Sequence, residues 1–219
     1  MISLILSLKF EEIYRMKKVV LLIIVFLLAG LLAYRLFSGK EAKPAEVKDQ
    51  ALRISKNSGA FNTAFAELMS DYFSLKDALV EWDTLKADQA AYMLGQKADS
   101  LPMKELKGDS MVVMTAKSMA ASIGGEAKGF SGEVNIEAKR RAFNALTDQL
   151  YALINAVRYD GETIYHIRCP MAFKDSEEGY WLSNTSKIIN PYLGKKHPVY
   201  QQKMLGCGEV TDSLDFSKK

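Results

Sequence analysis

The two cysteines of this 219-residue chain lie near its C-terminus, and each is accompanied by a methionine. Met171 follows Cys169 by two positions, and Met204 precedes Cys207 by three. Thiolate and thioether sulfurs are soft ligands that select soft metal ions, above all Cu(I). These segments therefore predict a copper site, provided that the fold brings Cys169 and Cys207 together. In such a site Met171 and Met204 would add weaker bonds that tune affinity without adding charge.

Two histidines are further candidate ligands. His166 is close to Cys169 in sequence, but side chains alternate across an extended strand, so Cys169 and His166 are expected on opposite faces. Pro170 limits how far a regular strand can continue toward Met171. We therefore expect His166 to be a weaker candidate than the cysteines, and His197 to be either a ligand or a loop residue.

The same cysteines support two other interpretations. In an oxidising compartment they would form a Cys169–Cys207 disulfide that fastens the C-terminal segment to the rest of the fold without any metal. Closing that loop would contribute about 3 to 4 kcal/mol in the chain-entropy treatment. The third interpretation is a thiol oxidoreductase. The chain has no C-x-x-C, H-E-x-x-H, P-loop or G-x-S-x-G motif, so we expect no enzyme.

The N-terminal region contains an uncharged apolar run at residues 19–34, preceded by Arg15, Lys17 and Lys18. With its flanks it approaches the roughly 20 residues that span a bilayer. The basic leading flank places the N-terminus inside and the bulk of the chain outside. We expect residues 1–37 to be a cytoplasmic leader with a transmembrane anchor or signal, and the rest to lie on the periplasmic side of the inner membrane. The absence of an A-x-A site favours a retained anchor, and Met16 is an alternative start.

The remaining composition is that of a folded domain, with 48% hydrophobic and 25% charged residues. The formal net charge of +3, without a long run of Lys and Arg, argues against nucleic-acid binding. Residues 38–58 contain Gly39, Pro44 and alternating charges, and we expect a linker there. We expect the folded domain at residues 59–210 and a polar tail at 211–219.

Apolar residues recur at spacings of three and four from residue 61 to 82, which predicts a first helix with Asn57 or Ser58 as its cap. A second helix is expected from Asp83 or Thr84 to about residue 98, with Leu85, Ala91 and Leu94 turned inward. A third is expected from residue 109 or 110 to about 123, where Gly124-Gly125 would stop it. The longest is expected at about 135–158.

Four helices with short connections predict a mainly α fold: an antiparallel four-helix bundle, followed by a short strand at 163–169 and an irregular Cys/Met-bearing C-terminal segment. We expect the following residues to be buried together: Phe65, Leu68, Tyr72, Leu79, Phe143, Leu146, Leu150 and Ile154. Met111, Met114 and Met119 are expected to fill gaps in this core. Residues 139–141 should be a solvated basic face, and Trp181 and Tyr192 should cover an end of the bundle and shield the sulfurs.

Four ordered motifs carry a family resemblance. They are Cys-Pro-Met-Ala-Phe at 169–173, Gly-Tyr-Trp-Leu-Ser at 179–183, Ile-Asn-Pro-Tyr-Leu-Gly at 189–194 and Met-Leu-Gly-Cys-Gly-Glu-Val at 204–210. Together with residues 72–80 and 141–143, they resemble the family of domain of unknown function 3347, over about residues 55–210.

The resemblance implies a small periplasmic domain with a copper-binding role, which occurs alone or attached to adaptor subunits of heavy-metal efflux pumps. The ligands that it implies are Cys169, Met171, Met204 and Cys207. Residues 195–203 form a longer connection than the shortest family form, and this brings His197 near the implied site in sequence. A heavy-metal efflux adaptor subunit and the cytoplasmic membrane are the partners that we expect.

Overall fold

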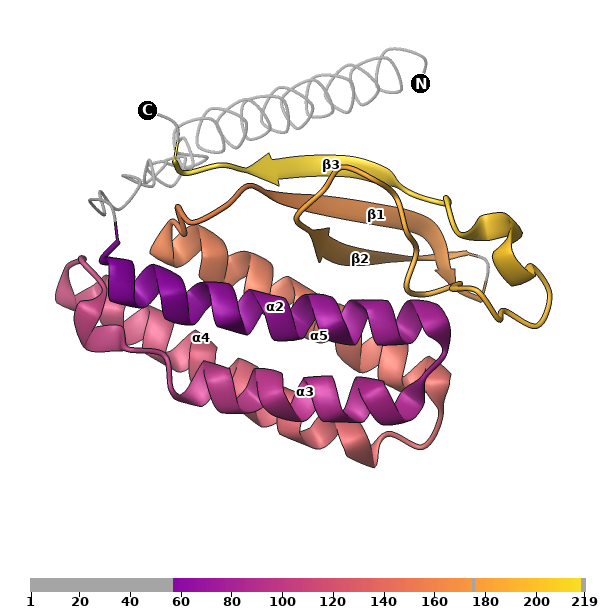
Figure 1. Ribbon diagram of the computed structural model, residues 1–219, viewed down its shortest axis with the longest axis horizontal. Helices are drawn as coiled ribbons and strands as arrows, with labels where there is room; N and C mark the ends of the chain where they lie inside the picture. The colour runs from indigo at the N-terminus through magenta and orange to yellow at the C-terminus, as the bar shows by residue number, and fades with distance from the viewer. Residues whose placement is uncertain (1–56, 175, 218–219) are drawn as a thin grey trace, which may run out of the picture. The chain divides into compact units, whose positions relative to one another are not determined.

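A computed structural model describes residues 57–174 and 176–217, and Figure 1 shows their arrangement. The long helices are α2 (Gly59–Glu81), α3 (Thr84–Asp99), α4 (Ser110–Gly129) and α5 (Ile136–Val157). The strands are β1 (Ile164–Phe173), β2 (Glu177–Ser183) and β3 (Glu209–Leu214), and short 3-10 helices are η1 (Met103–Glu105), η2 (Phe130–Gly132) and η3 (Gln201–Met204). The prediction of a mainly α protein is confirmed.

The predicted leader, membrane segment and most of the predicted linker, residues 1–56, lie outside the described residues. Among the helices that are described, none combines the length and the apolar character that crossing a membrane requires.

Each long helix begins at a side chain that caps it. Ser58, Asp83, Asp109 and Asn135 each accept a hydrogen bond from the backbone N–H three positions later. Such a cap satisfies a backbone donor that the first turn leaves without a partner. Because capping is local in sequence, the predicted helix starts agree with the structure to within about two residues.

The predicted end of the third helix is wrong. Helix α4 continues through Gly124 and Gly125 to Gly129. A Cβ at position 124 would collide with the Asp99 carboxylate and lie 3.5 Å from the Gly95 carbonyl oxygen. Gly124 therefore allows α3 and α4 to approach closely, and its role is in packing rather than in helix termination.

The predicted core is confirmed. All eight residues expected to be buried together are fully buried: Phe65, Leu68, Tyr72, Leu79, Phe143, Leu146, Leu150 and Ile154. Aromatic stacking joins α2 to α5 and to the residue after its C-cap, with ring centroids 5.2 Å apart for Tyr72 and Phe143 and 4.5 Å apart for Phe65 and Tyr159. Successive helices also contact one another, α2 with α3, α3 with α4 and α4 with α5.

Three apolar side chains expected inside are exposed instead. Leu85 is 80% exposed, Met111 is 59% exposed and Met114 is 61% exposed, whereas Met119 is half-buried against the core. The inner face of α4 is made largely of small residues, Ala116 and Ala120 among them. The prediction failed because α4 packs closely through these small side chains and leaves the two methionines on its outer face.

Of the three basic residues predicted to form a solvated face at the start of α5, Arg141 is exposed as predicted, and the other two are buried. Lys139 and Arg140 are each 5% exposed. Lys139 pairs with the Asp88 carboxylate at 2.5 Å. The Arg140 guanidinium lies 4.2 Å from the centre of the Trp82 ring, and its Nε donates to the Pro191 carbonyl at 3.0 Å. Burial lowers the pKa of Arg140 to about 10. These cations connect elements that are distant in sequence.

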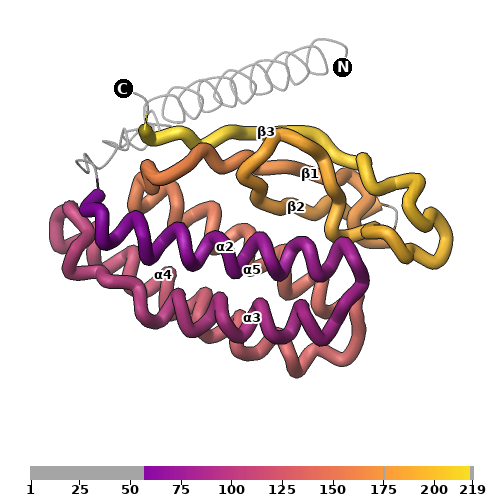
Figure 2. Tube along the Cα trace, viewed as in Figure 1, coloured from indigo at the N-terminus to yellow at the C-terminus, as the bar shows by residue number. Residues whose placement is uncertain are grey.

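The C-terminal part is a three-stranded antiparallel sheet in the order β2-β1-β3, where the sequence predicted one short strand. Strand β3 includes residues expected in the polar tail, and its last residue, Leu214, is buried. Figure 2 shows the sheet along α2 and α5. The hydroxyl of Tyr72 in α2 accepts from the Leu182 N–H at 2.9 Å, and Asn144 in α5 accepts from the Tyr180 N–H at 2.8 Å.

Residues 184–208, between β2 and β3, are here called the cover segment. This irregular segment passes across the sheet and then extends beyond it to η3 before it returns as β3 (Figure 1). It covers the sheet face that carries Ile167, Cys169 and Trp181, and all three side chains are fully buried.

Candidate metal centre

Cys169 lies on β1, the central strand, and its side chain is fully buried. Opposite it on β2 is Gly179. A Cβ at Gly179 would lie 2.9 Å from the ring of Tyr192 and 2.7 Å from the Cβ of Ala172. The glycine therefore leaves room for the Tyr192 ring on the sheet. Pairing of Cys169 with Gly179 of β2, and of the preceding Arg168 with Glu209 of β3, holds this part of the backbone in place.

Cys207 lies in the turn between η3 and β3, and polar contacts hold that turn. Its N–H donates to the Met204 carbonyl at 3.0 Å. Its own carbonyl accepts from the side chain of Asn190 at 2.7 Å. Asn190 is fully buried, and its Oδ1 accepts from the N–H groups of Tyr192 and Leu193. One side chain thus fixes the Asn-Pro-Tyr-Leu-Gly motif and the position of Cys207.

Gly208 completes this turn with a φ of 148°, a conformation that favours glycine. A Cβ at this position would lie 2.7 Å from the Trp181 ring and 2.9 Å from the Arg168 carbonyl. This geometry lets the backbone bend next to Cys207. Gly206 has open space around it and an ordinary φ, so only Gly208 is required by close approach.

The two cysteine sulfurs meet between the sheet and the cover segment. Their Sγ atoms are 3.3 Å apart, and both residues are free thiols. A disulfide needs about 2.05 Å between its sulfurs. Two thiolates on one tetrahedral metal with bonds of about 2.3 Å would lie about 3.8 Å apart. The observed separation lies between these values, so small side-chain movements reach either arrangement.

Burial is the main cause that raises the pKa of Cys207 to about 12, and the hydrogen bond to Cys169 and the negative charge of Cys169 add to the effect. Cys207 is therefore protonated at neutral pH. A metal that binds here must displace this proton, so its affinity should fall with acid.

The surroundings of the pair are apolar and aromatic. Trp181 and Tyr192 are buried, with ring centroids 6.1 Å apart. Tyr192 also packs on Phe143, which lies within α5 and not at its end, so this contact differs from the predicted cover over an end of the bundle. The Trp181 Nε1–H is buried and has no hydrogen-bond acceptor among the described residues. The cover thus shields the sulfurs from most of the solvent.

Both methionines lie on the segments that carry the cysteines. Met204 ends η3 and is half-buried, and its carbonyl accepts from Cys207 as described above. Met171 is also half-buried, two residues after Cys169. The pairing of β1 with β2 shifts register between Cys169 and Phe173, so Met171 lies in an irregular part of this pairing. Both methionines pack against the edge of the core.

His166 lies on the opposite face of β1 from Cys169, as alternation predicts. Its ring stacks between Tyr151 and Tyr180, with centroid distances of 4.4 and 4.9 Å. Its Nδ1 lies 3.1 Å from the Thr211 hydroxyl. Burial lowers the pKa of His166, which the charge of Asp212 opposes. The structure therefore places His166 in an aromatic stack with α5 and does not bring it to the sulfur pair.

His197 organises its own loop. Its Nδ1 accepts from the N–H groups of Val199 and Tyr200, at 3.3 and 3.2 Å. Its ring stacks on Tyr200 and meets the edge of Trp82. These contacts orient His197 toward the end of α2, and they give it the loop role that was one of its two expected roles.

Sequence reasoning missed Asn190 and Arg140, which hold the cover segment. Arg140 anchors the chain at Pro191, and Asn190 joins that point to Cys207. In the sequence, the Asn-Pro pair stands out only as part of a family motif. Asn190 and Cys207 are 17 residues apart in the sequence, and Arg140 and Pro191 are 51 residues apart. No local sequence pattern therefore shows either contact.

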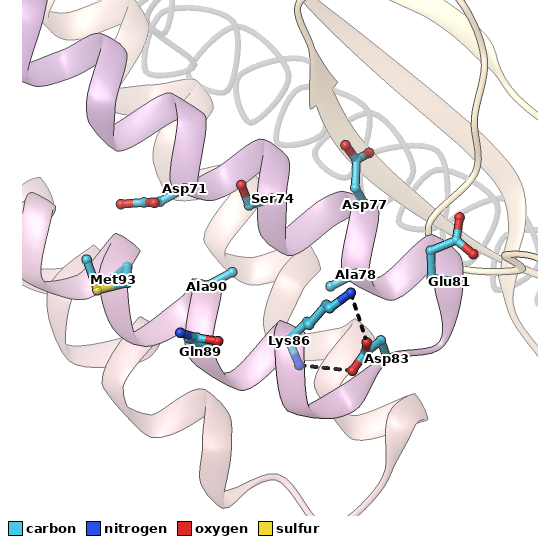
Figure 3. A pocket seen from close by; sticks show the side chains of 10 residues that line it. All are labelled: Asp71, Ser74, Asp77, Ala78, Glu81, Asp83, Lys86, Gln89, Ala90 and Met93. Atoms are coloured by element: carbon cyan, nitrogen blue, oxygen red, sulfur yellow. Dashed lines mark hydrogen bonds and ion pairs between the residues drawn. The ribbon is translucent and has the colours of Figure 1, made fainter.

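A separate groove of about 460 Å³ runs between α2 and α3, and Figure 3 shows its acidic lining. Asp71, Asp77, Glu81 and Asp83 line it, with Lys86 paired to Asp83 at 3.6 Å. In residues 57–174 and 176–217, no three His, Cys, Asp or Glu side chains are grouped so as to hold a metal ion. A metal at the sulfur pair would therefore depend on thiolate and thioether ligands.

Comparison with known proteins gives one match. Residues 68–161 match the family model described as "Protein of unknown function (DUF3347)". No curated protein and no solved structure matches the chain. The matched range runs from α2 to the turn after α5 and ends before the strand that carries Cys169. The match over the four helices supports a resemblance of this chain to the DUF3347 family.

Proposed function

We propose that this protein binds Cu(I) through the thiolates of Cys169 and Cys207, and that it carries or buffers copper outside the cytoplasm. The observation that supports this most strongly is the 3.3 Å approach of two free thiols in a shielded site. In this proposal the four helices are an antiparallel bundle that serves as a scaffold. The Cys/Met-bearing segment on the sheet is the metal-binding element.

The donor set fits Cu(I) better than the harder metals. Soft sulfur ligands favour Cu(I), and Cu(I) needs only a small number of ligands. Zn(II) in structural sites takes four strong ligands, and this site offers two thiolates. Met171 and Met204 would add thioether bonds, since each lies within three residues of a cysteine. Copper is the cargo here, and we propose no enzymatic step.

Location and partner are part of the same proposal. Residues 1–37 would anchor the protein in the inner membrane, with the metal site in the periplasm. The partner would be a heavy-metal efflux adaptor subunit that receives the copper. Fusing a reporter to the C-terminus tests the orientation, because a reporter that works only in the cytoplasm would contradict it.

A competition titration tests metal binding. The full chain is solubilised in detergent, reduced, and titrated anaerobically with Cu(I) against a chromogenic Cu(I) chelator. We expect one high-affinity Cu(I) per chain. Cys169→Ser or Cys207→Ser should abolish it, and Met171→Leu or Met204→Leu should weaken it by a smaller factor, because the volume is kept and one soft donor is lost.

Met119→Leu is the matched control, because Met119 is half-buried on α4 and belongs to neither sulfur-bearing segment. An unchanged affinity in the double cysteine variant would refute the proposal. The alternative function is a permanent structural disulfide. Counting the thiols of the native protein before and after treatment with reduced glutathione decides between them, because a permanent disulfide would leave no free thiol in either sample.

A further inference from the structure

The sulfur pair has a second chemistry besides metal binding, and its geometry is suited to both. Bringing the Sγ atoms from 3.3 Å to disulfide distance requires a movement of about 1.3 Å. Cys169 is fixed on the central strand, but Cys207 lies in a turn that precedes the first residue of β3. Next to it, Gly206 has open space around its Cα. The contact with Asn190 holds the backbone of Cys207, so the movement is a rotation of its half-buried side chain.

We propose that Cys169 and Cys207 form a redox gate, in which a reversible disulfide closes the site to metal and its reduction opens the site. The metal side of this inference rests on the proposed function. The reversible formation of the disulfide does not rest on the proposed function, because it follows from the approach of the two sulfurs alone.

The solvent exposure of the two cysteines determines which of them reacts first with an external disulfide. Cys169 is fully buried, whereas Cys207 is half-buried. A small external disulfide can therefore reach Cys207 first. The Cys207 thiolate attacks it, forms a mixed disulfide and releases one external thiol. The Cys169 thiolate then attacks the Cys207 sulfur and releases the second external thiol.

The electron balance of this exchange is complete. The two protein thiols lose two electrons and two protons in forming one S–S bond, and the external disulfide is reduced to two thiols. No other cysteine exists in the chain, so neither sulfur has another partner within it. Because metal and disulfide use the same two sulfur atoms, each state excludes the other.

The experiment uses the full chain and oxidised glutathione as the probe. Reduced protein is incubated with the probe, and its free thiols and disulfides are mapped by mass spectrometry of peptides. We expect an internal Cys169–Cys207 disulfide in the unaltered protein. In Cys169→Ser a glutathione adduct should accumulate on Cys207, and in Cys207→Ser Cys169 should react much more slowly.

Cu(I) titration of the oxidised and the re-reduced protein follows. High-affinity binding should disappear on oxidation and return on reduction. Free Cu(I) at 100 times its Kd should slow oxidation about 100-fold, because only the unoccupied fraction reacts.

Persistent adducts on both cysteines of the unaltered protein, or an oxidised protein that binds Cu(I) as tightly as the reduced one, would overturn the gate. A reduced protein that forms the disulfide reversibly and never binds Cu(I) would instead refute the proposed function, and with it the metal side of the gate. Mapping the unaltered protein keeps the test valid even if a serine variant fails to fold.

Discussion

The four helices and the cover segment are both densely packed, but different forces hold them. The helices bury apolar stripes that recur at helical spacing, with Leu150 and Leu68 as typical members. The cover segment is held at a few points by polar contacts. Trp82 donates to the Leu193 carbonyl at 3.1 Å, and the Lys195 N–H donates to the Val80 carbonyl at 2.8 Å.

This difference shows how the molecule separates stability from site geometry. Loss of one apolar side chain from the helices should weaken the whole domain and leave the folded site intact. Loss of one polar anchor in the cover segment should displace Cys207 with less effect on the rest. Four predictions test this separation.

The largest expected effect is on the ionisation of Cys207. Its pKa of about 12, against an ordinary value of 9.0, corresponds to a thiolate fraction about a thousand times lower near neutral pH. Titration of the reduced protein by thiolate absorbance should therefore show one thiol that resists ionisation beyond pH 9. In Cys169→Ala the pKa should fall, since the hydrogen-bond partner and the neighbouring charge are gone.

The raised pKa of Cys207 also determines how the stability of the folded protein changes with pH. The folded protein keeps this proton where the unfolded chain loses it, so this group reduces stability as pH rises above about 9 toward 12. Denaturant unfolding of the reduced protein and of Cys207→Ala should show the difference. An equal decline in both proteins would contradict the assignment.

Leu150→Ala should lower the free energy of unfolding by about 2 to 5 kcal/mol, because it leaves a cavity in the helical core. Urea unfolding followed by circular dichroism measures this. Below the transition, the thiol titration of the variant should match that of the unaltered protein. A changed titration in the folded variant would show that the helices and the site are coupled.

Asn190→Ala should lower the free energy of unfolding by about 1 to 3 kcal/mol, because it leaves buried backbone groups without their partner. Unlike Leu150→Ala, it should also make Cys207 more reactive toward alkylating reagents. Asn155→Ala is the matched control, since Asn155 is an exposed asparagine of α5 that donates to a carbonyl of its own helix. Equal reactivity of Cys207 in both variants would show that Asn190 does not position Cys207.

The smallest effect is expected from Asp109→Ala, which removes the cap of α4. It should cost about 1 kcal/mol. Thermal unfolding measures the loss, and the reactivity of Cys207 should not change. Asp109→Asn preserves the cap and should restore most of the stability.

The helices were predictable because their signals are local. Caps act over three residues, and Phe65, Leu68 and Tyr72 mark a buried face by spacing alone. Strands β2 and β3 carried no comparable signal. All but the last position of β3 is exposed, as an edge strand permits, so no apolar alternation marks it. Strand β2 begins with Glu177 and Glu178 and contains a glycine.

The two cysteines could be singled out from the sequence, but the residues that support them could not. Cys169 and Cys207 stood out by residue type, and the structure brings them together. The burial of Arg140 depends on Pro191, 51 residues away, and no pattern near Arg140 indicates it. The exposure of Met111 and Met114 was missed for a related reason, since helical spacing alone does not show which face of α4 is covered.

Trp181 and Trp82 are the only tryptophans of the chain, and they lie in contrasting surroundings. Trp181 is buried beside the sulfur pair, whereas Trp82 is partly exposed against Arg140. The protein therefore contains its own optical probes. In Trp82→Phe, all tryptophan emission would come from Trp181, so its wavelength and intensity would follow the chemical state of the two sulfurs in real time, without an added dye.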